Sequence, residues 1–366
     1  MEKDGKIAYF NILRFIGAIC ISVLFHYRSE FLIFEGLGNP FPSNPFLFRI
    51  SVFGGVFVSM FFIMSGILFT FVYRRKIENR MLFDDFIIKR IIRLWPLIII
   101  TCVFMYIINC ILYFEGYGFW EYGTEDIFYL FVNMIFGGGN VFGEITYFNA
   151  SIWYLNILLI CYILAYILTQ LSIKYKSKCI YFLPIFIGFM MLFSDEQRVL
   201  WNHSVYRGFT GFFMGVILGF IFSKFNNLAP RYMLIIKCVV ALELFCVVLF
   251  IKTFGYMSDI HFYYTFLIFP EVLILFYNCR YINKICSGKV ITFLGNISFG
   301  IYMWNFPIYI SWHYLYVKNR IPFSVTSHTF VFINLLTHII VAAISYCLID
   351  KKLCRLLNQL YSKRRA

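Results

Sequence analysis

The first apolar stretch of the sequence, from Asn11 to Tyr27, holds two side chains that can carry a positive charge. Arg14 lies near its start and His26 near its end. Charged or titratable groups are costly inside a bilayer and are rare there without a partner or a function. Imidazole suits general acid–base catalysis near neutral pH, and no zinc-type partner of His26 is nearby in the sequence. His26 is therefore a candidate general base, and the alternative is a structural hydrogen bond within a helix bundle.

Arg14 lies 12 residues before His26. In an α-helix this spacing separates the two residues by about 18 Å along the axis and by about 120° around it. A straight helix would therefore not turn both side chains toward one groove. Arg14 either contacts a ligand or extends toward the headgroups at the inner end of the span.

Arg90 and Arg93 are three residues apart in a basic segment, so on a helix their side chains share a face. Two neighbouring guanidinium groups suit the binding of a phosphate-bearing ligand from the cytoplasm. The alternative is an ordinary group of basic residues that marks the cytoplasmic side of a membrane protein.

The composition predicts an all-α, polytopic membrane protein. Of the 366 residues, 61% are hydrophobic and 14% are charged, and the mean hydropathy is +0.78. A soluble domain is closer to half apolar and a quarter charged. The net charge of +14 does not indicate a nucleic-acid partner, because the basic residues lie between apolar runs. The 11 cysteines show no zinc or redox spacing, so we expect free thiols and no metal.

About ten transmembrane helices account for the apolar runs, each long enough to cross the hydrocarbon core. Segments predicted to lie inside hold 23 of the 32 basic residues, which places both termini in the cytoplasm. Residues 1–350 then form one transmembrane domain, and 351–366 form a basic cytoplasmic tail. The predicted spans are 9–27, 50–73, 94–113, 152–171, 180–194, 208–223, 233–251, 262–279, 291–315 and 329–349.

The segment 114–151 contains no Lys or Arg and has one apolar run, Ile127–Phe136, which is too short to span a membrane. We predict an outer loop with an interfacial or re-entrant helix.

Further candidate residues lie at the ends of predicted spans. Arg207 precedes three glycines spaced four apart, Gly211, Gly215 and Gly219, for which close helix packing is the common explanation. Aromatic and polar residues at span ends either mark the membrane interface or stack on sugar rings. The residues of this kind are Trp153, Tyr154, Tyr302 and Asn305.

Taken in order, these segments resemble the acyltransferase-3 family of membrane-bound O-acyltransferases, which modify bacterial surface polysaccharides. The resemblance covers almost the whole chain and departs from the family pattern twice. Eleven residues separate Arg14 from His26 where the family has ten, and Asn305 replaces a histidine. The matching residues are Leu13-Arg14, His26-Tyr27, Gly55-Val56, Phe61-Phe62, Ser65-Gly66, Leu68, Arg90, Arg93, Pro96, Trp153-Tyr154-Leu155, Ser298, Gly300-Ile301-Tyr302 and Pro307.

The resemblance implies an O-acetyltransferase of the bacterial inner membrane. Acetyl-CoA, or another acyl-CoA, would bind from the cytoplasm through Arg90 and Arg93, with Arg14 as a further contact. His26 would act as general base on a sugar hydroxyl of a lipopolysaccharide, a capsule or a lipid-linked precursor. Residues expected to contact this carbohydrate acceptor are Arg207, Trp153, Tyr154, Tyr302 and Asn305.

Two other functions fit the same features. A lipid-linked saccharide flippase or exporter would also have buried polar groups and a basic inner face, although no paired half-repeats with matching helix breaks are visible. A non-enzymatic membrane scaffold would not need the ordered charged motifs. The oligomeric state is not readable from the sequence.

Overall fold

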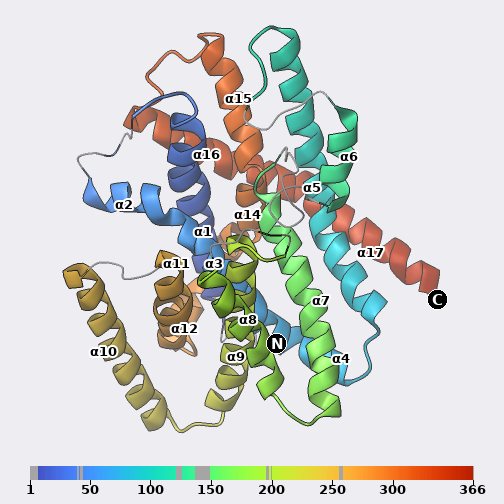
Figure 1. Ribbon diagram of the computed structural model, residues 1–366, viewed down its shortest axis with the longest axis vertical. Coiled ribbons are helices and arrows are strands. Elements are labelled where there is room, and N and C mark those ends of the chain that lie inside the picture. The colour runs from blue at the N-terminus through green and yellow to red at the C-terminus, as the bar shows by residue number, and fades with distance from the viewer. Residues whose placement is uncertain are drawn as a thin grey trace. The chain divides into compact units, whose positions relative to one another are not determined.

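The computed structural model describes residues 7–38, 41, 44–120, 126–136, 149–194, 198, 200–254 and 259–365. These residues form helices and their connections, and no β-strand is found among them (Figure 1). The prediction of an all-α protein is therefore confirmed.

Among the described residues, seven helices are long and apolar enough to cross a membrane, and a bent pair raises this number to eight. The multi-pass prediction is confirmed, whereas ten spans and the orientation of the termini stay predictions. The predicted span 180–194 corresponds to a shorter apolar helix, Cys179–Leu192. The seven spans are Phe10–Leu32, Phe46–Glu78, Phe83–Phe114, Ile152–Lys174, His203–Phe225, Pro230–Thr253 and His328–Lys363, and the bent pair is Ile260–Phe276 with Arg280–Cys286, at 91°.

The chain divides into two compact units. Unit 1 consists of Met1–Leu13, Val58–Asp85 and Ile157–Thr292, and unit 2 consists of Arg14–Phe57, Phe86–Asn156 and Phe293–Ala366. The two units also contain the helices α2 (Pro45–Phe53), α4 (Arg75–Glu78), α8 (Phe182–Leu192), α12 (Phe269–Phe276), α13 (Arg280–Cys286) and α17 (Lys351–Arg365).

In unit 1, α9 (His203–Phe225) packs closely on α3 (Phe57–Leu68) through glycines. A Cβ atom added to Gly215 would lie 2.0 Å from the carbonyl oxygen of Ile63, and one added to Gly66 would lie 1.9 Å from that of Phe212. Both distances are far below a van der Waals contact, so these positions admit no side chain. The close-packing interpretation of the glycine stripe is confirmed.

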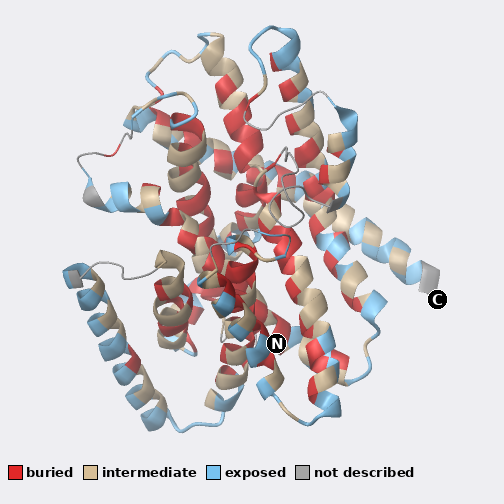
Figure 2. Cartoon of the chain, in the orientation of Figure 1, coloured by how far each residue is buried: buried red, intermediate tan, exposed pale blue. Residues whose placement is uncertain are grey.

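Helix α10 (Pro230–Phe254) of unit 1 exposes side chains along its length (Figure 2). It is among the most apolar of the candidate spans. A helix that is apolar on its exposed sides fits a lipid environment, because lipid tails solvate such a surface without cost.

In unit 2, the first span is not a regular α-helix. Helix α1 (Phe10–Ile19) continues as two π-helical segments, η2 (Cys20–Phe25) and η3 (Tyr27–Leu32), which flank His26. π-Turns are rare and occur frequently at functional sites.

The predicted span 291–315 is also interrupted. Helix α14 (Lys289–Met303) ends before Trp304, and α15 (Asn305–Val317) begins after it. Pro307 explains the break, because proline has no N–H to donate and its ring clashes with the carbonyl four residues earlier. The predicted span 291–315 thus corresponds to two helices separated by one residue, and its crossing of the membrane stays a prediction.

Between α5 (Phe83–Phe114) and α7 (Ile152–Lys174) lies a short helix that contacts α5 within unit 2. Trp95 of α5 donates a hydrogen bond from Nε1 to the carbonyl of Met134, over 3.0 Å, in α6 (Ile127–Phe136). Trp95 lies 19 residues, or about 29 Å of helix, from the end of α5 at Phe114. Helix α6 therefore lies against α5 well before the end of that helix, and both the interfacial and the re-entrant interpretation stay predictions.

Candidate functional site

A hydrogen bond joins His26 of the first span to Asn305 at the helix break in unit 2. Asn305 Nδ2 donates to His26 Nδ1. Asn305 is fully buried and His26 is half-buried. The rings of Phe25 and Phe306 both lie beside the imidazole, with centroids at 5.3 and 5.2 Å. The structure thus brings together the predicted base and the residue that replaces the family's histidine.

The π-helical segment η2 changes the predicted orientation of Arg14 relative to His26. A π-turn holds one residue more than an α-turn, because its hydrogen bonds reach residue i+5 and not i+4. If η2 absorbs one residue in this way, eleven α-helical steps separate the two side chains, which corresponds to a rotation of about 20°. By this count, η2 accommodates the additional residue between Arg14 and His26. The two side chains would then be about 20° apart around the helix axis and not about 120° apart.

Hydrogen bonds to later segments of the chain hold the first span on both sides of His26. Tyr309 of α15 donates to the carbonyl of Ser22, and Tyr27 donates to that of Val325. Tyr309 in turn accepts a hydrogen bond from Asn334 Nδ2 in α16 (His328–Ser345), over 3.2 Å. Since π-helical turns are otherwise unfavourable, these contacts explain how the distorted segment is held.

A second histidine, His338 of α16, was not singled out from the sequence. It is fully buried, and its Nδ1 donates to the carbonyl of Asn334 over 2.8 Å. Its Nε2 has no hydrogen-bond partner among the described residues, and the ring interacts electrostatically with His26. The only available sequence signal was a histidine within a predicted span.

Asn149, three residues before α7, contacts the break between α14 and α15. Its Nδ2 donates to Thr101 Oγ1 over 3.1 Å and to the carbonyl of Met303 over 2.9 Å. Met303 ends α14, so its carbonyl has no partner one helical turn further on. Irregular backbone at membrane depth is tolerated where it is buried in protein or lines a cavity. Asn149 therefore stabilises the broken helix by donating to the carbonyl of Met303.

Aromatic side chains predicted to contact the acceptor lie in unit 2 as well. The rings of Tyr154 and Tyr302 are nearly perpendicular, with centroids 5.8 Å apart, and both residues are buried. Trp153 is half-buried beside Tyr154. The tyrosine pair is thus part of the packed interior and leaves little ring surface open.

Comparison with known protein families matches residues 7–348 to the acyltransferase domain of the acyltransferase-3 family. The chain belongs to this family. The match covers nearly the whole chain and confirms the resemblance seen in the sequence motifs. No curated protein and no solved structure matches the chain. This acyltransferase-3 protein is accordingly a multi-pass membrane protein of an acyltransferase family.

In this acyltransferase-3 protein, the paired arginines of α5 occupy different environments. Arg90 is buried, with its guanidinium 5.1 Å from the ring centroid of Phe86, whereas Arg93 is exposed. Arg90 and Arg93 are three residues apart, so their side chains lie about 60° apart around the axis of α5. The boundary between the buried and the exposed face of α5 runs between them. The two groups do not form a symmetrical pair, and Arg93 is the accessible one.

The other two predicted arginines lie apart in the acyltransferase-3 chain. Arg14 is half-buried in α1 and belongs to unit 2. Arg207 is buried in α9 of unit 1, where its charge acts on Tyr206 and His261.

Proposed function

We propose that this acyltransferase moves an acyl group, most simply acetyl, from cytoplasmic acyl-CoA to a sugar hydroxyl of a surface polysaccharide or its lipid-linked precursor. The observation that carries the proposal is the contact between His26 and Asn305 beside a broken helix. Ionisable residues within membrane spans are rare, and those that occur usually mark substrate pathways or proton-transfer sites.

In the proposed reaction, His26 removes the proton from the acceptor hydroxyl. The alkoxide oxygen forms a bond to the thioester carbonyl carbon, and the carbon–sulfur bond breaks. The thiolate of CoA leaves and takes up a proton, for which protonated His26 is the donor. One residue can thus act as base and then as acid, as is common for histidine.

The hydrogen bond to Asn305 determines which nitrogen of His26 faces the acceptor. In a neutral imidazole one nitrogen donates and the other accepts. With Asn305 Nδ2 donating to Nδ1, the proton is on Nε2. The amide oxygen Oδ1 of Asn305 has no hydrogen-bond partner among the described residues. A half-turn of the amide would let Oδ1 accept a hydrogen bond from Nδ1–H of His26. The proton of the neutral ring would then be on Nδ1, and the lone pair of Nε2 would be free to act as base. Asn305 can therefore support both the base and the acid form.

Binding of the acyl donor is assigned to the arginines of unit 2. Arg93 is exposed and can pair with a phosphate of CoA directly, while Arg90 supports it from the buried side of α5. Arg14 is a further candidate, since it belongs to the same unit.

An apolar groove in unit 2 suits the thin arm of the donor. It encloses 270 Å³ beside the helix break and is lined by Phe104, Trp304, Pro307, Trp312 and Val341. Such a lining favours methylene and methyl groups over sugar hydroxyls, because unpaired polar groups are costly against it. Within unit 2, the acceptor contact is therefore assigned to Trp153, which is half-buried, because the rings of Tyr154 and Tyr302 are packed in the interior.

The alternative, a saccharide flippase or exporter, is supported by the same broken helix, a feature that transporters also use. Mass spectrometry of the host's surface glycan separates the two. Cells with the wild-type protein should carry an ester that is absent with His26→Gln, while the amount of surface glycan stays the same. A loss of the glycan itself in the variant would favour transport, and an unchanged ester would reject the proposal.

A further inference from the structure

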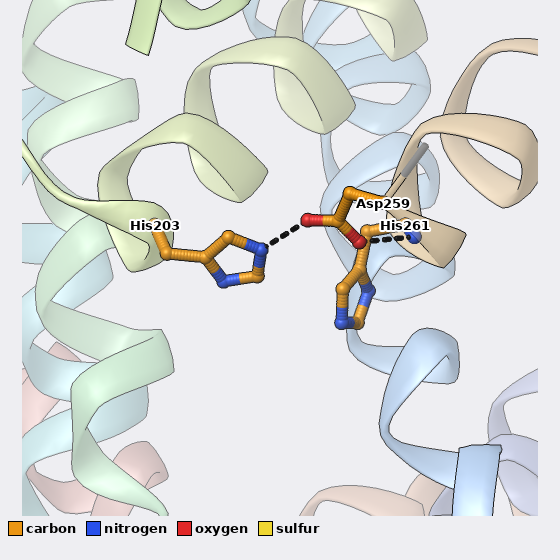
Figure 3. A group of neighbouring side chains, drawn as sticks. All are labelled: His203, Asp259 and His261. Atoms are coloured by element: carbon orange, nitrogen blue, oxygen red, sulfur yellow. Dashed lines mark hydrogen bonds and ion pairs between the residues drawn. The ribbon is translucent and has the colours of Figure 1, made fainter. Parts of the chain in front are cut away.

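Three side chains that commonly bind metals converge in unit 1 (Figure 3). His203 is the first residue of α9, and Asp259 and His261 lie at the start of α11 (Ile260–Tyr263). One potential ligand atom from each residue lies within 4.8 Å of the other two. His203 Nε2 and Asp259 Oδ2 are 2.5 Å apart, and the two imidazole rings have centroids at 5.2 Å.

We propose that His203, Asp259 and His261 form a binding site for a divalent transition metal ion, with zinc as the best-fitting ion. Two imidazole nitrogens and one carboxylate oxygen make up a three-ligand set that leaves a fourth position for water. Zinc–nitrogen and zinc–oxygen bonds of about 2.0–2.2 Å in a tetrahedron separate the ligand atoms by about 3.4 Å. His203 Nε2 and Asp259 Oδ2 lie closer than this, and all three ligand atoms lie within 4.8 Å of one another, so the proposal requires only small side-chain movements.

The carboxylate of Asp259 is already oriented for this role. Its Oδ1 accepts the backbone N–H of His261 over 2.8 Å and caps α11, which leaves Oδ2 directed at His203. Outer hydrogen bonds that fix a ligand in this way are typical of metal sites. The metal would replace the proton shared between His203 and Asp259.

His261 provides an independent observation. Its Nδ1 is buried and has no hydrogen-bond partner among the described residues. A buried imidazole nitrogen without a partner lowers stability, and binding of the ring to a cation would offset this cost. His203 is partly exposed, with 45% of its side chain accessible, so an ion can enter.

Charges around the cluster have opposite effects. Arg207 of α9 acts electrostatically on His261 and disfavours a cation, whereas the Asp259 carboxylate favours it. Tyr206 lies against His203, with ring centroids at 5.5 Å. The sequence predicted no metal because 56 residues separate His203 from Asp259 and only the fold brings them together.

Zinc titration of the purified full-length chain in detergent tests the site, after alkylation of its free thiols. Wild type should bind one zinc ion saturably and show a higher melting temperature with zinc. His203→Gln, Asp259→Asn and His261→Gln should each weaken binding at least about 10-fold, the lower end for loss of a metal-site group. Asn can still cap α11, so Asp259→Asn should fold.

The matched control is His328→Gln, which removes an exposed histidine from the start of another helix. It should bind zinc as the wild type does. The proposal is overturned if the wild type shows no saturable binding, or if the three cluster variants bind as tightly as the control.

Discussion

Asn305 donates a hydrogen bond to His26 across 279 residues of sequence, at a point where the first span is π-helical and a later helix is broken. In enzymes with a Cys–His–Asn arrangement, the amide oxygen accepts a hydrogen bond from Nδ1–H of the catalytic histidine. Asn305 would make that contact after a half-turn of its amide, which presents Oδ1 to His26. The family's usual histidine at this position is thus replaced here by a residue that can donate or accept but cannot itself exchange a proton.

Replacing Asn305 tests its role as a positioning residue. Asn305→Leu removes the hydrogen bond at similar volume, and we expect the kcat for acyl transfer to fall about 10- to 100-fold, as for partners that orient metal-bound imidazoles. The KM for acyl-CoA should stay within about twofold. Asn305→His restores the residue typical of the family and should retain more activity than the leucine variant. Equal losses in both variants, or a change in KM alone, would contradict the assignment.

Arg93 and Arg90 should respond differently to substitution by alanine. Arg93 is exposed, so Arg93→Ala should leave the melting temperature unchanged and raise the KM for acyl-CoA about 10- to 100-fold, since charge-assisted contacts contribute about 1.5–3 kcal/mol. Arg90 is buried, so Arg90→Ala should lower both stability and affinity. Arg231→Ala, at another exposed basic position, is the control. An unchanged KM in Arg93→Ala would remove this residue from the donor site.

The contact between α3 and α9 predicts a strong steric effect at Gly215. The methyl group of Gly215→Ala would overlap the carbonyl of Ile63, so the helices must separate. Overpacking of this kind costs about 1–3 kcal/mol. Gly38→Ala, where no atom lies within 4 Å of the added methyl, is the matched control. Thermal unfolding in detergent should show a lower melting temperature for Gly215→Ala only, and equal values would reject the close contact.

An ion pair at the surface of unit 2 predicts a dependence of stability on pH. Lys318 Nζ lies 2.7 Å from Glu115 Oε2, and its hydrogen bonds to Glu115 and Tyr314 raise the pKa of Lys318. The stabilisation is fully present below the lysine's ordinary pKa and is lost as the pH rises through the raised value. The melting-temperature difference between wild type and Lys318→Met should therefore be constant at pH 8–9 and shrink above about pH 10.4. A difference that does not depend on pH would exclude this pair as its source.

The helical class and most spans could be predicted from the sequence, because a chain in lipid must satisfy its backbone groups within each helix. The predicted starts were less accurate where basic residues extend a helix beyond the apolar core. Helix α5 begins at Phe83 and includes Arg90 and Arg93, eleven residues before the predicted start at 94. Pro307 was visible in the sequence and could have indicated the break at Trp304.

The contacts of the candidate site could not be predicted in this way. No residue pattern indicates π-turns at Cys20–Phe25, because they depend on hydrogen bonds from Tyr309 and other distant residues. The positions of Asn149 and His338 likewise follow from tertiary packing. The motifs identified His26 and Asn305 separately, and only the fold joins them.

Transfer of a labelled acyl group in membranes tests the central claim, that His26 catalyses acyl transfer, most directly. Membranes with wild-type protein should move label from acetyl-CoA to glycan. Because general base catalysis contributes about 10²- to 10⁴-fold, His26→Gln should lower the rate by that factor at unchanged protein level. His328→Gln should be as active as the wild type. Full activity of His26→Gln, or no transfer by the wild-type protein, would contradict the account.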